Sequence, residues 1–458
     1  MVKIDLSNPC SVYFIGIGGI SMSGLAEVLA DRGFAVSGSD RAPSPVTENL
    51  ERRGIQINYV QRAENITGTI DLVVYTAAIH PDNPEYAESV RLGIPMMSRA
   101  DLLGEIMAMY PDSVAISGTH GKTTTTSMIS EILLAAGKDP TLSIGGMLNS
   151  IGGNIRIGRS GLFVTEACEY TNSFLSLTPK TALILDIDAD HLDFFKDLAD
   201  IRRSFRIFAE KIPADGTLII SSDIDSLEEI TGGLPCRIVT FGSDAAKSDY
   251  FASEITYNSG ACGSFTLNSP DGSTRISLAV PGAHNILNAL AAAAAADVLG
   301  IAREDTARGL LAFGGTHRRF EYRGEFNGVT VIDDYAHHPT EIRATLTAAS
   351  KLDHGRLFCA FQSHTYSRTA ALLDDFAKAL SLADMVLVAP IYAARETDTL
   401  GMSAELLADK INAAGGHAAA FPDFVSIENF VKENCAKNDL LITMGAGNID
   451  TIAKDLAG

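Results

Sequence analysis

Short apolar runs that each end in a polar or glycine-rich cluster recur along this chain, and they constrain its fold more than any other feature. Examples are SVYFIGIGG, VAISGTHGKT, ALILDIDADH, VTVIDDYAHHP and LLITMGAGN. Runs that are apolar on both faces are typical of strands buried in parallel sheets, with helices between them. In open α/β sheets, ligands bind beyond the carboxyl ends of the strands, where these clusters fall. The pattern therefore predicts an α/β protein with its sites at strand ends.

Helical segments fit between these runs. Residues 21–33, 123–137 and 284–300 carry apolar side chains at helical spacing, and each segment ends at a glycine. The alanine run in the last segment indicates close packing between helices.

The length of the chain indicates several domains. Its 458 residues correspond to roughly three domains at ~150 residues each. The best boundary signals are the loops near residues 97–113 and 313–328. We therefore predict domains at residues 1–105, 106–316 and 317–458.

Charge and cysteine usage exclude several classes of protein. The net charge of −20 argues against non-specific nucleic-acid binding, which needs a basic surface. No apolar stretch reaches the ~18 residues that a membrane span requires. The six cysteines are scattered without C-x-x-C pairs, which favours reduced thiols over disulfides or a zinc site. We expect a cytoplasmic protein with no nucleic-acid or membrane partner.

The first glycine cluster, FIGIGGISMSG, partly matches a dinucleotide-binding fingerprint. Gly16 and Gly18 are in place, but Ser21 stands where the third glycine is needed. Asp40 ends the next apolar run. One interpretation is a tight turn with no ligand, and the other is a nucleotide diphosphate held by backbone N–H groups at a helix N-terminus. Ser21 argues against a third possibility, an NAD-dependent oxidoreductase.

The second cluster, SGTHGKTTTTS, is a shortened phosphate-binding loop. A full P-loop needs glycine at the position of Ile116, but Gly118, Gly121, Lys122 and Thr123 remain. Lys122 would reach the β- and γ-phosphates of a nucleotide, and the Thr123 hydroxyl would bind Mg²⁺. The alternative is a threonine-rich helix start with a surface lysine, which would not explain the paired glycines.

Acidic and basic clusters end later runs. Glu166 and Glu169 follow one run, and Asp188, Asp190 and His191 follow another, so both could supply ligands to Mg²⁺. The last third concentrates histidines and arginines in three segments, GGTHRRFE, DDYAHHP and HTYSR. Arginine offers bidentate geometry to carboxylates and phosphates, so these segments indicate anion recognition.

Taken in order, the motifs GIGGISMSGLAEVL, GTHGKTTTT, DADHLDFF, PGAHNILNALAA, GGTHRRFE, DDYAHHPTEI and HTYSR resemble the Mur ligases across the whole chain. The similarity is greatest to the branch that adds L-alanine. In that family the shortened loop G-T-x-G-K-T is the normal ATP site. The resemblance implies a Rossmann-like N-terminal domain for the UDP-sugar, a central P-loop-type ATPase domain with a mostly parallel sheet, and a Rossmann-like C-terminal domain.

The resemblance also implies a role for individual residues. It assigns Lys122, Glu166, His191 and His337 to catalysis, and Thr123, Glu166 and His191 to the metal. It assigns ATP to Gly118, Thr119, His120, Gly121, Lys122, Thr123, Thr124, His284, Asn285, Asn288, Arg319 and Asp334. It assigns the other substrates to Gly16, Gly18, Gly19, Ile20, Asp40, Tyr335, His364 and Arg368.

The activity implied is ATP- and Mg²⁺-dependent joining of L-alanine to UDP-N-acetylmuramate through an acyl phosphate, by a monomer or weak homodimer. A recycling ligase of the same family, which attaches a whole tripeptide, is an alternative, and a non-catalytic nucleotide-binding protein is another. One departure affects the substrate pocket. The common acidic motif E-A-D-E-S-D reads E-A-C-E-Y-T here, with Cys168 and Tyr170 replacing Asp and Ser.

Overall fold

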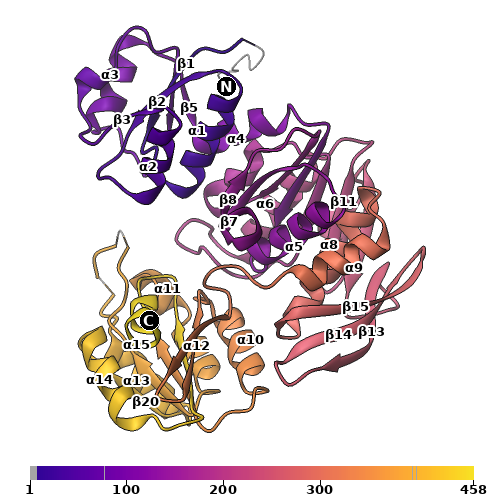
Figure 1. Ribbon diagram of the computed structural model, residues 1–458, viewed down its shortest axis with the longest axis vertical. Helices are drawn as coiled ribbons and strands as arrows, with labels where there is room; N and C mark the ends of the chain where they lie inside the picture. Colours follow the sequence, from indigo (N-terminus) through magenta and orange to yellow (C-terminus); the bar gives the residue numbers. More distant parts are fainter. Residues whose placement is uncertain (1–7, 77, 395, 399) are drawn as a thin grey trace.

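The computed structural model describes residues 8–458 except 77, 395 and 399. Figure 1 shows three lobes that follow one another along the chain, from the indigo N-terminal lobe through the central lobe to the yellow C-terminal lobe. Among the described residues, the strands form three sheets, one in each lobe. The predicted three-domain α/β fold is confirmed, since each sheet is flanked by its own helices.

The N-terminal lobe is built around strand β1 (Ser11–Ile15), which is almost wholly buried, as its apolar run predicts. The glycine-rich turn after β1 leads into helix α1 (Ile20–Asp31). The other elements are β2 (Ala35–Ser39), α2 (Pro45–Arg52), β3 (Gln56–Asn58), η1 (Ala63–Asn65), β4 (Leu72–Tyr75), α3 (Pro84–Leu92), β5 (Met96–Ser98) and α4 (Arg99–Met107). The sheet is parallel throughout, in the order β3-β2-β1-β4-β5.

The central sheet carries the second glycine cluster at the end of β6 (Asp112–Ser117), which lies between β9 (Leu162–Glu166) and β10 (Thr181–Ile184). Its other strands are β7 (Thr141–Leu148), β8 (Gly153–Arg156), β11 (Thr217–Ser221), β12 (Arg237–Gly242), β13 (Tyr250–Tyr257), β14 (Cys262–Ser269) and β15 (Gly272–Pro281). The order is β15-β14-β13-β12-β11-β10-β6-β9-β7-β8. Only the β13-β14-β15 and β7-β8 ends are antiparallel among the described residues, so the predicted mostly parallel sheet is confirmed.

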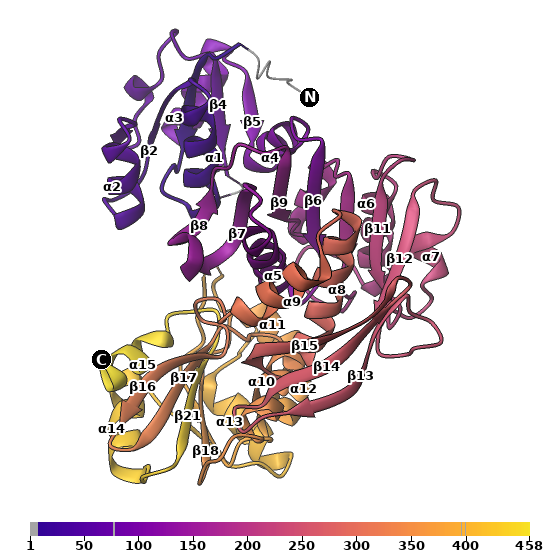
Figure 2. The same ribbon diagram turned by 45° about the vertical axis from the view of Figure 1, so that its right-hand side comes forward.

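Three central helices pack against one another beside this sheet, as Figure 2 shows: α5 (Lys122–Ala135), α8 (His284–Val298) and α9 (Arg303–Ala312). The alanines at 289 and 291–296 in α8 are all buried. At Gly309 a Cβ atom would collide with the backbone of α5 at Ile132. Small residues therefore allow the helices to approach closely, as the alanine run predicts. The remaining central elements are η2 (Asn149–Ile151), η3 (Tyr170–Ser176), α6 (Leu198–Ala209) and α7 (Glu228–Thr231).

The C-terminal lobe has strands β16 (Glu321–Phe326), β17 (Val329–Asp334), β18 (Leu357–Phe361), β19 (Met385–Val388), β20 (Ala418–Ala420) and β21 (Leu440–Met444). Its helices are α10 (Pro339–Ala349), α11 (Tyr366–Ala371), α12 (Leu373–Leu380), α13 (Ala404–Ala413), α14 (Phe424–Asn434) and α15 (Asp450–Ala457). The sheet order is β16-β17-β21-β18-β19-β20, with only the β16-β17 pair antiparallel among the described strands.

The predicted domain boundaries fall between the sheets. The boundary at 105/106 lies inside α4, and the boundary at 316/317 lies in the loop between α9 and β16. Both positions stay predictions. In the part of the chain that the structure describes, every helix is too short or too polar to cross a membrane.

Candidate active site at the junction of the lobes

The shortened phosphate-binding loop joins β6 to α5. Gly118 has φ +135° and Gly121 has φ +80°, conformations that favour glycine. A Cβ atom on Gly121 would lie 2.5 Å from Asn288 Oδ1, so the residue at 121 must also be small. The loop is further fixed by Asp186, whose Oδ1 accepts the backbone N–H of His120 at 2.8 Å. The backbone therefore requires glycine at both positions, as expected for a phosphate loop but not for a simple helix start.

Lys122 begins α5 and turns back over the loop. Its Nζ donates to the carbonyl oxygen of Gly118 at 2.5 Å and to Glu169 Oε2 at 3.0 Å. Burial alone would lower the pKa of Lys122, but the Glu169 carboxylate raises it above its ordinary value. The ammonium is therefore kept charged at the point where the loop closes.

The predicted metal ligands only partly converge. Thr123 Oγ1 donates to Glu166 Oε2 at 3.1 Å, and Glu166 Oε1 accepts the N–H of Gly145 at 2.5 Å. His191 contacts a different carboxylate, with its Nε2 3.7 Å from Glu169 Oε1. Burial lowers the pKa of His191, which favours the neutral ring that binds metals. The Thr123 hydroxyl and the Glu166 carboxylate, side by side, are the oxygen donors that Mg²⁺ prefers, whereas the His191 imidazole is a nitrogen donor that lies against another carboxylate.

A cavity of about 270 Å³ lies between α5, α8 and α10, and we call it the P-loop cavity. Most of the residues predicted to bind ATP line it: His120, Gly121, Thr123, Thr124, His284, Asn285, Asn288, Arg319 and Asp334. They come from the central and C-terminal lobes, so the structure brings together segments as far apart in sequence as His120 and Asp334. Thr119 and Gly118 lie in the loop outside this lining, where Thr119 Oγ1 accepts the N–H of Asp188 at 2.9 Å.

The polar residues of this cavity are held in place by one another. Asn288 Nδ2 donates to Asn285 Oδ1 at 3.0 Å at the start of α8. Asp334 accepts the N–H groups of Ala336 and Phe320 at 2.7 and 2.9 Å. Burial raises the pKa of Asp334 to about 6 and lowers the pKa of His284 to about 4.

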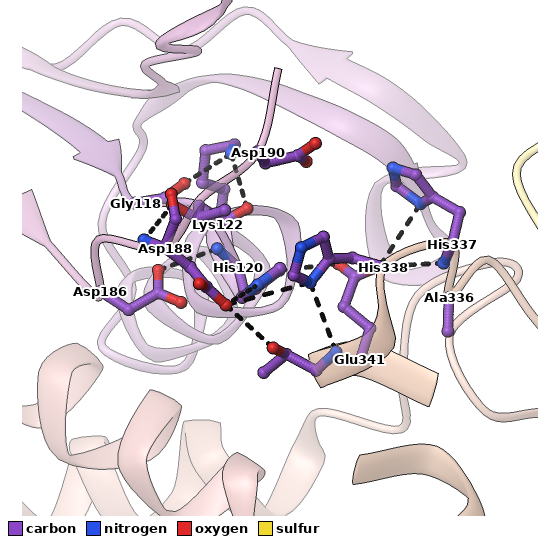
Figure 3. A network of polar contacts seen from close by, with 12 residues as sticks. Gly118, His120, Lys122, Asp186, Asp188, Asp190, Ala336, His337, His338 and Glu341 are labelled. Atoms are coloured by element: carbon purple, nitrogen blue, oxygen red, sulfur yellow. Dashed lines mark hydrogen bonds and ion pairs between the residues drawn. The ribbon is translucent and has the colours of Figure 1, made fainter. Parts of the chain in front are cut away.

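His120 joins the central lobe to the C-terminal lobe, as Figure 3 shows. Its ring lies between Asp188 Oδ2 at 3.4 Å and Glu341 Oε1 at 3.3 Å. Burial would lower the pKa of His120, but the hydrogen bonds to these two carboxylates raise it to about 10. The ring is therefore a cation that links the phosphate loop to the first turn of α10.

Other contacts support this junction. Thr340 Oγ1 donates to Asp188 Oδ2 at 2.9 Å, and His338 Nε2 lies 3.3 Å from the carbonyl oxygen of Ala189. The ligand atoms of His120, Asp188 and His338 lie within 4.8 Å of one another, close enough to hold a metal. Those atoms are already used in hydrogen bonds, so we interpret the cluster as a junction between lobes.

A second cavity of about 340 Å³, the histidine cavity, is lined by the predicted residues His191, Tyr335, His337, His364 and Arg368. Arg368 Nη2 donates to Asp190 Oδ1 at 2.9 Å across the lobe boundary. It also donates from Nη1 to His364 Nδ1 at 3.2 Å.

His337 is a neutral ring in this cavity. Its Nδ1 lies 3.0 Å from the carbonyl oxygen of Tyr335 and 3.3 Å from Glu341 Oε2. Because both neighbours are acceptors, Nδ1 carries the proton and Nε2 keeps its lone pair. Burial lowers the pKa of His337 to about 4, so the ring is neutral at neutral pH and its Nε2 lone pair is available.

The N-terminal glycine turn lies apart from both cavities. Gly16 has φ +82°, and the Gly18 N–H donates to Asp40 Oδ2 at 2.7 Å. Gly19 is the N-cap of α1 and makes no side-chain cap, while Ile20 is 58% exposed. Ile20 lines a third cavity of about 250 Å³, the Arg99 cavity, together with Ser21, Arg99, Glu166 and Cys168. Of the predicted UDP residues, Ile20 at the start of α1 is the one that lines this cavity beside the central lobe.

Two residues that shape the site were not among the predicted ones: Glu341 pairs with His120, and Arg99 lines the third cavity. The sequence contains only a weak signal for Glu341, because an acid in the first turn of a helix is normally assigned to capping. Glu169 is a candidate metal ligand by sequence, and in the structure its carboxylate pairs with Lys122. Arg318, from the predicted arginine pair, instead fixes the fold by donating to Asp333 and to the carbonyl oxygens of Gly445 and Gly447.

Comparisons with known proteins agree with this geometry. Three family models match in order: the Mur ligase family catalytic domain at residues 11–111, the Mur ligase middle domain at 116–296 and the Mur ligase glutamate ligase domain at 318–447. The UDP-N-acetylmuramate–L-alanine ligase of Agathobacter rectalis is 57% identical, over 100% of this chain and 99% of the relative. The enzyme of that name from Lachnospira eligens is 56% identical, over the whole of both chains.

Solved structures show the same arrangement. The UDP-N-acetylmuramate-alanine ligase of Thermotoga maritima superposes with a TM-score of 0.80 at 29% identity, covering 97% of this chain and 98% of that chain. A murein peptide ligase from Psychrobacter arcticus superposes with a TM-score of 0.72 at 27% identity, covering 98% of both. On the strength of the full-length identity and the three matching domains, the chain belongs to the Mur ligase family.

Proposed function

We propose that this chain is an ATP- and Mg²⁺-dependent ligase that joins L-alanine to the lactyl carboxylate of UDP-N-acetylmuramate. The products are UDP-N-acetylmuramoyl-L-alanine, ADP and phosphate, and the reaction supplies a peptidoglycan precursor. The observation that carries the proposal is a phosphate loop that lines the P-loop cavity and is linked by polar contacts to residues of the other two cavities, in a chain 57% identical to a ligase of that name. Thr123 bonds to Glu166 of the Arg99 cavity, and Lys122 connects through Glu169 to His191 of the histidine cavity.

The first step activates the acid. A lactyl carboxylate oxygen attacks the γ-phosphorus of ATP, the bond to the β-phosphate oxygen breaks, and ADP leaves an acyl phosphate behind. The Lys122 ammonium, held charged by Glu169, would offset the charge that develops on the phosphoryl oxygens. When bound at Thr123, Glu166 and His191, Mg²⁺ supplies further neutralisation of that charge. We assign the adenosine to the P-loop cavity, lined by His284, Asn288 and Asp334.

The second step forms the amide. The amine of L-alanine attacks the acyl carbon, and phosphate leaves with the electrons of the broken C–O bond. The attacking nitrogen must lose a proton, and we assign its acceptance to Nε2 of His337, a neutral ring that lines the histidine cavity. Tyr335, His364 and Arg368 line the same cavity and would position the amino acid and the lactyl end of the sugar.

The glycine turn would hold the UDP end of the substrate, with Gly16, Gly18, Gly19, Ile20 and Asp40 nearby. Support comes from α1, which starts without a side-chain cap and so leaves amide groups free for an anion. We expect a cytoplasmic enzyme, because ATP is the energy source, and a monomer or weak homodimer.

A purified-protein assay tests this function. ADP and phosphate should form only when UDP-N-acetylmuramate, L-alanine, ATP and Mg²⁺ are all present. Replacing L-alanine with the tripeptide tests the recycling-ligase alternative, which the L-alanine ligase relatives do not favour. Turnover with the tripeptide and none with L-alanine would reject the proposed acceptor. ATP binding without any acceptor-dependent turnover would instead indicate a non-catalytic nucleotide-binding protein.

A further inference from the structure

Arg99 lies where a ligand is expected to bind. Its positive charge has no carboxylate partner among the described residues. It follows β5 directly and begins α4, so it lies at the carboxyl edge of the N-terminal sheet, as does the glycine turn after β1. Ligands of open parallel sheets bind at this edge. The Arg99 side chain is partly buried and lines the Arg99 cavity, which extends from Ile20 and Ser21 to Glu166.

The guanidinium has no anionic partner among the described residues. Its Nη1 donates to Ser21 Oγ at 3.1 Å, and no carboxylate of the described chain forms an ion pair with it. By contrast, Arg318 and Arg368, which are also largely buried, each lie 2.9 Å from a carboxylate oxygen. A partly buried charge without a counterion is unfavourable, and burial accordingly lowers the pKa of Arg99. An anion in the cavity would remove this cost.

The surroundings of Arg99 suit an anion of extended shape. Ser21 lies in the first turn of α1, where backbone N–H groups have no partner within the helix and no side chain caps them. These groups and Arg99 thus lie on the same side of the cavity, joined by the bond to Ser21. Glu166, which bonds to Thr123 of the phosphate loop, lines the same cavity.

We propose that Arg99 binds the diphosphate of the nucleotide-sugar substrate and so positions the sugar with its lactyl end toward Glu166. This inference rests on the proposed function, because it takes its ligand from that reaction. It makes Arg99 a positioning residue that acts on binding, since the chemical steps are assigned to the phosphate loop and the histidine cavity.

Cys168 is consistent with an unpaired charge on Arg99. It lines the same cavity and stands where the common family motif has aspartate. A thiol leaves Arg99 free for an external anion, whereas a carboxylate at this position would compete with the substrate for it. The chain therefore offers a pair of tests in which only the charge near Arg99 changes.

The test is the affinity of the full-length protein for UDP and for uridine, measured by calorimetry and by competition, for the wild type and its variants. Arg99→Gln should weaken UDP binding about 10- to 100-fold, the loss expected for a hydrogen bond to a charged group, and leave uridine binding unchanged. Arg99→Lys should recover part of the affinity. Arg52→Gln, at an exposed arginine of the same lobe, should change the affinity for neither UDP nor uridine. Circular dichroism checks that the variants are folded.

Cys168→Asp should also weaken UDP binding, and Cys168→Ser should not. In turnover assays Arg99→Gln should raise the KM for the nucleotide-sugar and leave kcat within about threefold of the wild type, because binding is lost without loss of chemistry. Unchanged UDP affinity in Arg99→Gln would overturn the inference. Weaker binding of the whole nucleotide-sugar with unchanged binding of UDP would also overturn it, since the contact would then be with the lactyl carboxylate.

These outcomes are distinct from failure of the proposed function. If the wild type forms the L-alanine product and Arg99→Gln binds UDP normally, only the role of Arg99 is wrong. If the wild type forms no product with any acceptor, the proposed function is wrong whatever the effect of Arg99 on UDP.

Discussion

Lys122 shows how a single residue combines a structural and a chemical role. Its ammonium is held by the Gly118 carbonyl and by the buried carboxylate of Glu169, so it keeps its charge although the side chain is largely buried. An incoming phosphate would replace the oxygens of Gly118 and Glu169 around Nζ with its own oxygens. If the loop binds a triphosphate as we propose, the charge needed there is already in place before the nucleotide binds.

Lys122→Ala should abolish most of the ligase activity. We expect kcat to fall by at least about 10²-fold, the loss typical of removing a donor that stabilises developing charge. The same change leaves Glu169 buried without its partner, so the melting temperature should fall as well. The measurement is phosphate release with all substrates saturating. Lys138→Ala, at an exposed lysine just beyond the other end of α5, is the control and should retain full activity.

His337 allows a sharper test because its role depends on a proton. If Nε2 accepts the proton of the attacking amine, His337→Gln should lower kcat about 10²- to 10⁴-fold at neutral pH. The loss should diminish as the pH rises, since more L-alanine then arrives already neutral. His417→Gln, at an exposed histidine of the same lobe, should have no effect at any pH. A loss that is equal at pH 7 and pH 9.5 would mean that His337 has another role.

Site residues could be predicted from the sequence where they belong to one short motif, and not where distant segments bring them together. Gly118, Gly121, Lys122 and Thr123 form one motif, so their proximity could be predicted from sequence. Glu169 and Glu341 could not, because each acquires its partner only when separate strand ends or lobes meet. A carboxylate in a helix first turn or at a strand end has several ordinary explanations, and sequence offers no way to choose among them.

At the scale of elements, apolar runs predicted the parallel strands well. The runs at β1, β6, β10, β17 and β21 are buried on both faces, and only strands of that kind produce an unbroken apolar signal. The hairpin strands β14 and β15 were not predicted. Their burial alternates along much of their length, so their sequences mix polar with apolar residues and resemble loops.

Substitutions at the two glycines that flank α5 distinguish the effect of backbone strain on stability from its effect on ATP binding. Gly121→Ala adds a methyl group at φ +80° that would lie 2.5 Å from Asn288 Oδ1, so both the loop and α8 must shift. We expect ATP affinity to fall by about tenfold or more, since strain in this region costs about 1–3 kcal/mol. Gly137→Ala has a similar φ of +66° but faces open space. It should lower the melting temperature and leave ATP affinity unchanged, as measured with a fluorescent nucleotide.

At the scale of the whole molecule, a set of polar contacts joins the central and C-terminal lobes at the active site. His120, Asp188 and Asp190 on one side meet Thr340, Glu341 and Arg368 on the other. Polar interfaces within a chain allow the lobes to separate. Substrates would therefore enter when the lobes part, and the active site would be complete only when they meet.

The charge on His120 makes this docking sensitive to pH. Its pKa is about 10 in the docked state, against an ordinary value of 6.5. Asp188, on the same lobe as His120, raises this pKa whether or not the lobes are docked, and Glu341 raises it further only when they meet. The charge on the ring therefore favours docking at neutral pH, and this contribution is lost as the pH rises through about 10. The docked fraction, measured by energy transfer between dyes on the two lobes, should therefore fall between pH 7 and pH 10. In His120→Gln the fall should be much smaller, and a wild-type curve that is flat over this range would reject the role of the cation.

Glu341 tests whether docking of the lobes limits catalysis. It lies in the first turn of α10, with His120 at 3.3 Å on one side and His337 at 3.3 Å on the other. Glu341→Gln keeps the shape of the side chain but removes the charge that pairs with His120. We expect a lower docked fraction and a fall in kcat of about tenfold or more, because breaking one charged pair at an interface costs about 2–5 kcal/mol. Glu405→Gln, at an exposed glutamate in the first turn of α13, is the matched control and should change neither quantity. If Glu341→Gln lowered kcat while the docked fraction stayed the same, the carboxylate would act by orienting His337, and lobe docking would not be the step that it controls.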